Sequence, residues 1–216
     1  MPYLRRVAPT PEPLDCRILS AALDLFVENG YHRVSVHEIQ KHADVSIGSI
    51  YNHFGGKEGV AKALYKHILN EVDELVEDVS HEIASPSEQC KEIIRLLFEY
   101  TETRSNIMAF IFHAKHTEFL PNEPVICNAS PFIKIRTIIQ RAINNGELNG
   151  ADPWVVSSTV FGGAIRMIQL RLDGLIEKPL PEYYDSIIES AWKGIAGTGG
   201  HVGINPELHI QPTLMI

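Results

Sequence analysis

The fold is decided by the stretch SVHEIQKHADVSIGSIYNHF, residues 35–54. Ser35 and Glu38 stand at the spacing of a capping box, in which each side chain satisfies an amide left open at the start of a helix. Val36, Ile39 and Ala43 follow at spacings of three and four and form a narrow apolar stripe. The stretch therefore begins with a short helix that packs on one face and stays polar elsewhere.

A second short helix follows this one after a turn at residues 43–45. Ser46 is a favourable N-cap, and Ile50 and Phe54 form an inward pair at i,i+4. The outward side is then left with Ile47, Gly48, Ser49, Tyr51, Asn52 and His53. The major groove of DNA admits one α-helix that presents short polar side chains and an aromatic hydroxyl to base edges. This face therefore predicts DNA recognition; a helix pair that serves only for packing is the alternative.

The surrounding sequence resembles the helix-turn-helix of the tetracycline-repressor (TetR) family of bacterial transcription regulators. The resemblance covers about 50 residues, in order and at the family's spacings. The matching residues are Ile18, Leu19, Ala21, Ala22, Leu25, Phe26, Gly30, Tyr31, Ser35, Ile39, Ala43, Val45, Ser46, Gly48, Tyr51, His53, Phe54 and Lys57. The resemblance implies an all-α fold with an N-terminal three-helix DNA-binding domain and a C-terminal helical domain for effector binding and dimerisation.

Nine residues are the candidates for DNA contact. They are His37, Ser46, Ile47, Gly48, Ser49, Tyr51, Asn52, His53 and Lys57. Lys57 lies just past the second helix, at the start of the next one, where a cation and free amides would clamp a phosphate. The resemblance assigns Lys57 that role and places Tyr51 and His53 where family members contact backbone or bases. Ile47 departs from the polar residue often found at its position and could contact a thymine methyl.

Charge is segregated along the 216 residues, which are 44% hydrophobic and carry a net charge of −8. Residues 1–67 hold 8 Lys and Arg against 7 Asp and Glu, whereas the remainder holds 11 against 20. Only the first segment can approach phosphates, so the acidic remainder is expected to face away from DNA. Three widely spaced cysteines suit reduced thiols, and no apolar run has the length of a signal peptide or membrane span. We expect a cytoplasmic protein without membrane contact.

The chain contains no strand-like alternation of useful length, and capping and periodicity predict about nine helices. Residues 1–13, with four prolines and the pair Arg5-Arg6, predict a flexible basic arm; a disordered terminus without function is the alternative. Residues 14–60 are assigned to the DNA-binding domain and residues 61–196 to the effector-binding and dimerisation domain. The expected helices cover residues 15–29, 36–43, 47–54, 57–84, 86–103, 105–121, 130–145, 153–172 and 182–196. Residues 197–216 form a tail that no pattern places.

The effector is expected to be a small molecule whose identity the sequence does not determine, and no cofactor is implied. Apolar walls with few polar groups are typical of such sites. The candidates are Phe98, Thr101, Arg104, Met108, Phe112, His116, Phe132, Arg136, Phe161, Arg166 and Gln169. Arg104, Arg136 and Arg166 are the sharper cases, because arginine is seldom fully buried unpaired. Two of them facing a cavity would indicate an anionic effector; core packing and surface ion pairs are the alternatives.

The resemblance also implies a homodimer, in which the last two helices form a four-helix bundle with their symmetry mates. Gly162 and Gly163 lie inside a helix, where each glycine costs about 1 kcal/mol against alanine, so a close backbone approach is expected there. The candidate interface residues are Val156, Val160, Gly162, Gly163, Ile187, Ile188, Ala191, Trp192 and Ile195. The alternative is that this face packs only within the monomer.

The sequence therefore predicts a ligand-responsive regulator, a dimeric repressor of a palindromic operator in double-stranded DNA. An activator, or a regulator that needs its ligand to bind DNA, stays open. A redox or metal sensor on the same scaffold is the alternative, acting through Cys127 or the pair His113 and His116. No nucleophile with its base, phosphate-binding glycine loop or zinc signature appears, so an enzyme is not expected.

Overall fold

The structure is a computed structural model that describes residues 2–5, 9–10, 12–150 and 152–195. Over these residues the chain forms ten α-helices and three short 3-10 helices, with no β-sheet. The predicted all-α fold class is confirmed. None of the described helices has the length and apolar character needed to span a membrane.

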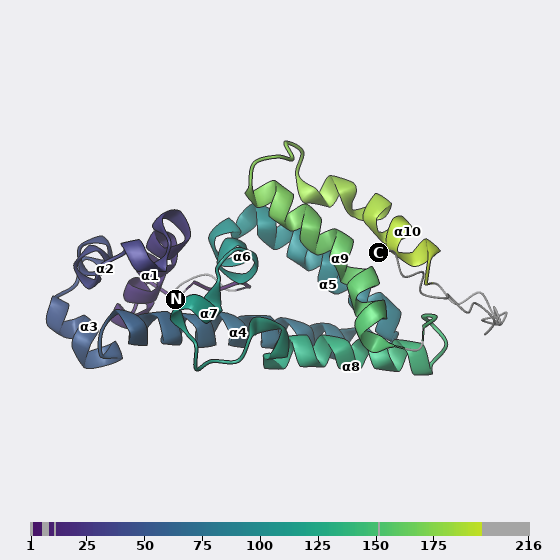
Figure 1. Ribbon diagram of the computed structural model, residues 1–216, viewed down its shortest axis with the longest axis horizontal. Coiled ribbons are helices and arrows are strands. Elements are labelled where there is room, and N and C mark those ends of the chain that lie inside the picture. Colours follow the sequence, from purple (N-terminus) through teal and green to yellow (C-terminus); the bar gives the residue numbers. More distant parts are fainter. Residues whose placement is uncertain (1, 6–8, 11, 151, 196–216) are drawn as a thin grey trace, which may run out of the picture.

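Three helices form a head at one end of the molecule, on the left in Figure 1: α1 (Leu14–Asn29), α2 (Val36–Ala43) and α3 (Ile47–Phe54). The 3-10 helix η1 (Tyr31–Arg33) joins α1 to α2. The predicted capping box is present, since the Ser35 hydroxyl accepts from the Glu38 amide and the Glu38 carboxylate accepts from the Ser35 amide. Ile39, Ala43 and Ile50 are buried as their spacing predicted.

Helix α4 (Lys57–Glu82) runs from the head along the length of the molecule (Figure 1). Its 26 residues span about 39 Å at 1.5 Å per residue. Val60, Leu64, Ile68, Leu75 and Val79 are buried along one side. Because α4 is one continuous helix from the end of α3 into the second half of the chain, a change in its tilt would displace α3.

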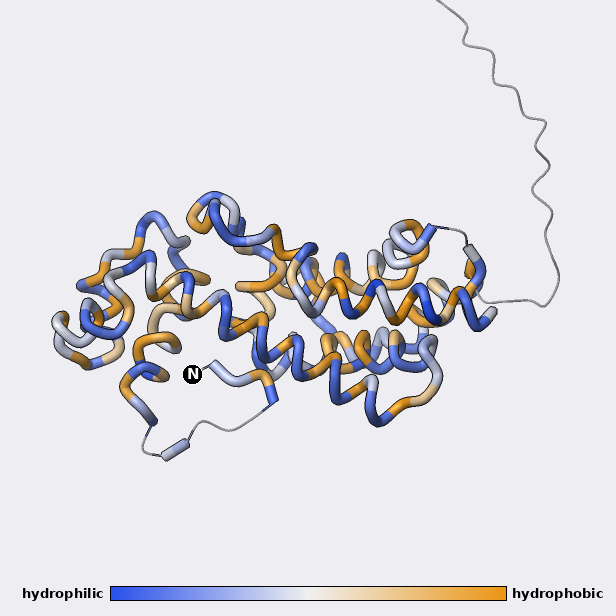
Figure 2. Tube along the Cα trace, turned by 90° about the horizontal axis from the view of Figure 1, so that it is seen from below, coloured by the Kyte–Doolittle hydropathy of each residue, from blue (hydrophilic) through white to orange (hydrophobic). Residues whose placement is uncertain are grey.

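The second half of the chain forms a body around the far part of α4. Its elements are α5 (Pro86–Thr103), α6 (Ser105–Phe112), α7 (His116–Phe119), η2 (Ile126–Asn128), α8 (Ser130–Asn144), α9 (Pro153–Leu172), η3 (Leu180–Tyr183) and α10 (Tyr184–Lys193). Helices α5, α8 and α9 pack on one another, α5 and α8 also contact α4, and α10 lies against α9. Figure 2 shows apolar and polar residues alternating along these helices, as expected when one side of each helix is buried.

The helix expected over residues 105–121 is wrong as a single element. It divides into α6 and α7, with a break at residues 113–115. The break turns His116 and Phe119 back toward the head, where Phe119 stacks on Tyr31 with ring centroids 4.6 Å apart. A straight helix would carry these two rings past Tyr31. Because the helix breaks here, the described chain has ten helices rather than about nine.

The flexible arm is also wrong for residues 2–5, which we call the N-terminal strap. Leu4 is 1% exposed, and its amide donates to the buried Glu71 carboxylate of α4 at 2.9 Å. Arg104 donates to the Tyr3 carbonyl at 3.1 Å, and Arg5 forms an ion pair with Asp78. The strap therefore lies against the α4–α5 side of the molecule, because α4 offers a carboxylate and an apolar contact that the composition of the terminus did not reveal. Arg6 and residues 197–216 lie outside the described residues.

Candidate functional site

Helix α3 presents its predicted outward face to solvent. Tyr51 is 54% exposed, and Gly48 and Asn52, on the same side of the helix, are exposed as well. The Ser46 hydroxyl accepts from the Ser49 amide at 3.1 Å, while Gly55 ends the helix with a positive φ of 75°. Both ends of α3 are thus held by caps, so the exposed face is presented on a short, well-terminated helix.

The remaining candidates for DNA contact surround this face. His37, Ser46 and His53 are exposed, whereas Ile47 and Ser49 are partly buried. His37 stands on the first turn of α2, on the same head. The structure thereby gathers eight of the nine predicted residues on the head, with the ninth, Lys57, turned away from solvent.

Lys57 does not have the free ammonium that a phosphate clamp requires. Its Nζ donates to the carbonyls of Tyr31 at 3.1 Å and Val34 at 2.8 Å, and lies 4.2 Å from the centre of the Tyr31 ring. These carbonyls belong to η1 and its C-cap, where backbone acceptors lack helical partners. The predicted role of Lys57 is corrected accordingly: the side chain ties the start of α4 to the α1–α2 connection.

Two side chains that the sequence analysis missed hold the turn between α2 and α3. The Arg17 guanidinium of α1 donates to the carbonyls of Ala43 at 2.7 Å and Asp44 at 2.5 Å. The Gln40 amide donates to the Val45 carbonyl at 2.8 Å. Asp44 has a φ of 51°, so the turn needs such support. No signal in the sequence reveals the Arg17 contact, because its partners lie 26 and 27 residues away.

The head also carries cations that remain available. Among the described residues, Arg33 of η1 and Lys41 of α2 are exposed and have no ion pair. Lys41 stands in the last turn of α2, the helix that precedes α3. Unpaired cations beside a groove-compatible helix are the groups that contact phosphates.

The predicted effector residues are buried or partly buried in the body, apart from the exposed Arg166, and their role in a pocket stays a prediction. Phe98 and Met108 are fully buried and Phe161 is 6% exposed. The Thr101 hydroxyl bonds to the carbonyl one turn earlier, at Leu97. Phe112, Phe132 and Gln169 are only partly buried. The apolar candidates therefore belong to the packed body and its margin.

The three arginines do not converge on a cavity either. Arg104 donates to the carbonyls of Tyr3 and Thr103. Arg136 donates to the Cys127 carbonyl at 2.7 Å and lies over the Trp154 ring at 4.3 Å, while Arg166 is exposed. Each guanidinium has a hydrogen-bond partner within the described chain, since Arg166 donates to Gln169 Oε1 at 3.5 Å. A pair of arginines for an anionic effector stays a prediction.

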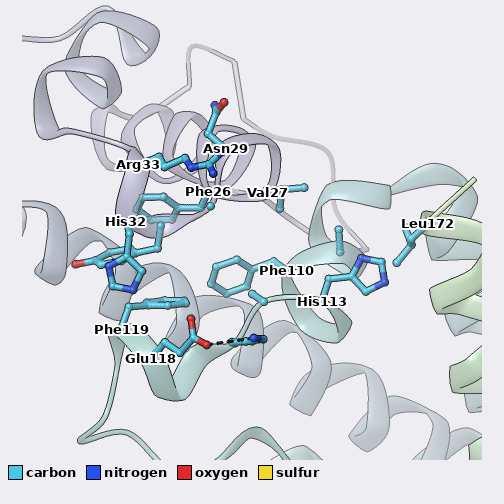
Figure 3. Close-up of a pocket in the computed structure, with 15 residues that line it drawn as sticks. Phe26, Val27, Asn29, His32, Arg33, Phe110, His113, Glu118, Phe119 and Leu172 are labelled. Carbon is cyan, nitrogen blue, oxygen red and sulfur yellow. Dashed lines mark ion pairs between the residues drawn. The ribbon is translucent and has the colours of Figure 1, made fainter.

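A cavity of about 560 Å³ lies instead between head and body (Figure 3). We call it the junction cavity. The end of α1 and η1 form one wall, and α6, α7 and Leu172 of α9 form the other. It is lined by Phe26, Val27, Asn29, Gly30, Tyr31, His32, Arg33, Ala109, Phe110, His113, Ala114, Lys115, Glu118, Phe119 and Leu172. None of the eleven predicted effector residues lines it.

His116 lies just behind the junction cavity, enclosed by aromatic rings. Tyr65, Phe110 and Phe119 have ring centroids 5.0, 4.9 and 5.8 Å from the imidazole. Burial lowers the pKa of His116 to about 4, and a hydrogen bond to the backbone of Phe110 opposes this only in part. Within the described residues its Nε2 has no hydrogen-bond partner. The imidazole is therefore held neutral inside the junction.

The proposed metal ligands do not come together. His113 faces Asp173, with Nε2 and Oδ1 3.7 Å apart, and Cys127 is exposed. Over the part of the chain that the structure describes, no three His, Cys, Asp or Glu side chains gather where they could hold a metal ion.

The predicted dimer residues divide between the interior and the surface. Val156 and Val160 are at most 2% exposed and Ile195 is 7% exposed, so these three pack within the chain. Ile187, Ile188, Ala191 and Trp192 of α10 are partly buried, whereas Gly162 and Gly163 are exposed. The outward side of α9 instead carries Trp154 and Val155, which are 56% and 63% exposed, beside Ser158, Thr159 and Gly162. Val156 and Val160 therefore face the body core, and the predicted interface stays a prediction that rests on α10 and on the outward side of α9.

Comparison with known proteins agrees with this geometry. A sequence model of the family described as bacterial regulatory proteins, tetR family, matches residues 18–64. The fatty acid metabolism regulator protein of Bacillus subtilis is 34% identical over 82 residues, which are 38% of this chain and 42% of that protein. The transcriptional regulator UidR of Escherichia coli is 42% identical over 53 residues, 24% of this chain and 27% of UidR. The matched parts thus span less than half of these relatives.

Solved structures extend the likeness of fold to most of the chain. A TetR family regulator from Marinobacter aquaeolei has a TM-score of 0.72 at 19% identity, covering 85% of this chain and 96% of that one. FadR of Bacillus subtilis, solved with stearoyl-CoA, has a TM-score of 0.65 at 22% identity, covering 86% of this chain and 98% of that one. The fold and the α3 face define a helix-turn-helix protein with a helical second domain. Over residues 18–64 the chain belongs to the tetR family of bacterial regulatory proteins, and its overall fold is that of solved TetR family regulators.

Proposed function

We propose that the protein is a ligand-responsive transcription regulator that binds operator DNA through α3. The observation that carries this proposal is the exposed face of Gly48, Tyr51 and Asn52 on a helix capped at both ends. Such a face fits the major groove, where short side chains and a tyrosine hydroxyl reach base edges. Ile47, Ser49 and His53 flank it, and Ser46, His37 and Lys41 stand where phosphate contacts fix the register.

The regulator acts as a homodimer in this proposal. Two heads related by a two-fold axis place their α3 helices about 34 Å apart and read a palindromic site. The exposed side of α9, with Trp154 and Val155, is the surface that supports pairing, since exposed apolar side chains of this size favour burial against a partner. Dimerisation through α9 and α10 would leave both heads free on the opposite side.

The dimer represses its target until a small molecule releases it. The continuous α4 supports this part of the proposal, because an effector that favours another tilt of α4 changes the separation of the two α3 helices. FadR of Bacillus subtilis, solved in complex with stearoyl-CoA, shows that this fold accommodates an acyl-CoA in another protein. The close sequence match is limited to 82 residues, so the effector of this chain is proposed only as a small molecule.

The test is binding of the purified protein to the DNA upstream of its own gene. Tyr51→Ala is expected to lower specific affinity by about 5- to 150-fold, because a good contact to a base edge contributes about 1–3 kcal/mol. Fluorescence anisotropy with labelled duplexes measures the affinity, and circular dichroism checks the fold. Tyr51→Phe is the matched control that keeps the ring and removes only the hydroxyl. Equal affinity of Tyr51→Ala and the wild type would refute the assignment of α3.

A further inference from the structure

We propose that the junction cavity binds an amphipathic organic anion, with an apolar body and one carboxylate, and that this ligand controls the position of the head. This inference rests on the proposed function, which requires an effector but does not place it. The cavity's volume of about 560 Å³ lies within the range that holds small-molecule ligands.

The walls of the junction cavity suit an apolar body. Four aromatic rings line it, those of Phe26, Tyr31, Phe110 and Phe119, together with the side chains of Val27 and Leu172. Figure 3 shows Phe26, Phe110 and Phe119 in its central part, between Arg33 and Asn29 on one side and His113 and Leu172 on the other. Aromatic walls contact both flat rings and acyl chains over a large area. Burial of such a ligand removes apolar surface from water on both partners.

The charge of the lining selects an anion. Lys115 is paired with Glu118 at 3.3 Å, and His113 faces Asp173 at 3.7 Å. Arg33, by contrast, has no ion pair among the described residues, so the rim carries one unbalanced full positive charge. A guanidinium binds a carboxylate with two parallel hydrogen bonds. A ligand with a single carboxylate therefore complements both the rim and the walls.

The position of the cavity couples its occupant to the DNA-binding surface. Tyr31 stacks on Phe119 of the body, with rings inclined by 15° and centroids 4.6 Å apart. The carbonyl and ring of the same Tyr31 hold the Lys57 ammonium at the start of α4. A ligand that moves Tyr31 away from Phe119 thus acts on the α3–α4 corner. Because one wall belongs to the head and the other to the body, an anion that binds one separation better shifts the equilibrium toward it.

Isothermal titration calorimetry with decanoate and with 2-naphthoate tests the cavity, each compared with its uncharged alcohol. At least one of the two anions is expected to bind with one molecule per chain, about tenfold more tightly than the corresponding alcohol. Arg33→Gln is expected to weaken that anion about tenfold, since hydrogen bonds to charged groups contribute that much or more. Arg141→Gln is the matched control, because Arg141 is an exposed arginine of α8. Failure of both anions to bind, or wild-type affinity of Arg33→Gln, would overturn the proposal.

A second variant fills the cavity. Ala114 lines it, so Ala114→Phe is expected to abolish anion binding while circular dichroism stays unchanged. Arg33→Gln, at an exposed position, provides the same test without a change in packing if Ala114→Phe does not fold. Full anion affinity of a folded Ala114→Phe would place the ligand elsewhere and overturn the proposal.

Operator binding is measured in the same samples. The bound anion is expected to change operator affinity of the wild type by at least tenfold and to leave that of Ala114→Phe unchanged. Anion binding without any effect on operator affinity would overturn the control of the head. Operator binding by a protein that binds neither anion would overturn the junction site and leave the proposed function standing. A protein that binds an anion but no DNA would contradict the proposed function, while calorimetry would still decide the cavity.

Discussion

The roles of single side chains in the head cannot be read from their neighbours in the sequence. Lys57 matches the family pattern as a phosphate contact, yet its ammonium lies on two carbonyls and a tyrosine ring. Lys41, which carried no prediction, is exposed and unpaired among the described residues. The two lysines have the same chemistry, so only their surroundings distinguish a structural tie from a phosphate contact.

Substitution of the two lysines is expected to give opposite results. Lys57→Met should lower the free energy of unfolding by about 2 kcal/mol, because two hydrogen bonds from a charged group are lost, and should leave the salt dependence of operator binding unchanged. Lys41→Met should leave stability within about 0.5 kcal/mol and lower the salt slope by about one unit. Urea denaturation and anisotropy at several salt concentrations measure both. A reduced salt slope for Lys57→Met would restore its predicted phosphate role.

His116 makes stability depend on pH below neutrality. The folded state holds its pKa at about 4, whereas the unfolded chain has the ordinary value of 6.5. Between these values the unfolded state binds more protons, so stability falls as pH falls. From pH 7 to pH 5 the loss is about 2 kcal/mol.

Urea denaturation of wild type and His116→Phe at pH 7 and pH 5 isolates this effect. The variant keeps an aromatic ring among Tyr65, Phe110 and Phe119 and is expected to lose about 2 kcal/mol less between the two pH values. His67, whose pKa is also lowered by burial, contributes equally in both proteins. Glu102 and Glu147 have lowered pKa values, so the stability that their ionised carboxylates give the folded chain is lost only at more acidic pH. The same pH dependence in both proteins would show that the buried imidazole is not responsible.

At the scale of elements, the positions where helices begin, end and break determine where the α3 face and the junction cavity lie. Caps predicted α1 to α5 within two residues of their observed bounds, because capping uses groups that are close in sequence. The break between α6 and α7 and the N-terminal strap were missed, since both depend on contacts with helices far along the chain. At the start of α5 the Ser85 hydroxyl accepts from the Glu88 amide, while the distant Glu147 carboxylate accepts from the Ser85 hydroxyl and the Ser87 amide.

The strap is expected to stabilise the folded chain. Leu4→Ala should lower the free energy of unfolding by about 2 kcal/mol, at the low end for a buried leucine because a terminal segment can relax. Leu175→Ala is the matched control, since Leu175 is 71% exposed, and should change stability by less than about 0.5 kcal/mol. Chemical denaturation followed by circular dichroism compares the two. An equal, small effect of both substitutions would show that the strap does not stabilise the folded chain.

At the scale of the whole molecule, the head and the body meet along α4 and around the junction cavity. The acidic remainder of the sequence lies largely in the body, at the end away from α3 (Figure 1). The proposed dimer surface on α9 also belongs to the body. In the proposed function, DNA, ligand and partner therefore have separate surfaces.

The α9 surface is expected to carry the dimer. Val155→Arg should weaken dimerisation by at least tenfold, because an unpaired charge in an interface is costly to desolvate. Val125→Arg is the control, since Val125 is 51% exposed in a loop of the body. Sedimentation equilibrium across protein concentrations measures both. An unchanged dimer in Val155→Arg would place the interface elsewhere.

The sequence by itself determined what depends on local rules. Helix periods, caps and the outward face of α3 follow from residues within a few positions of one another, and the segregation of charge follows from counting. The tertiary structure alone decided that Lys57 faces inward, that Phe98, Met108 and Phe161 are buried in the body and that the cavity lies at the junction. These outcomes depend on which distant side chains share one space, and the packing of whole helices, rather than residue type, determines that.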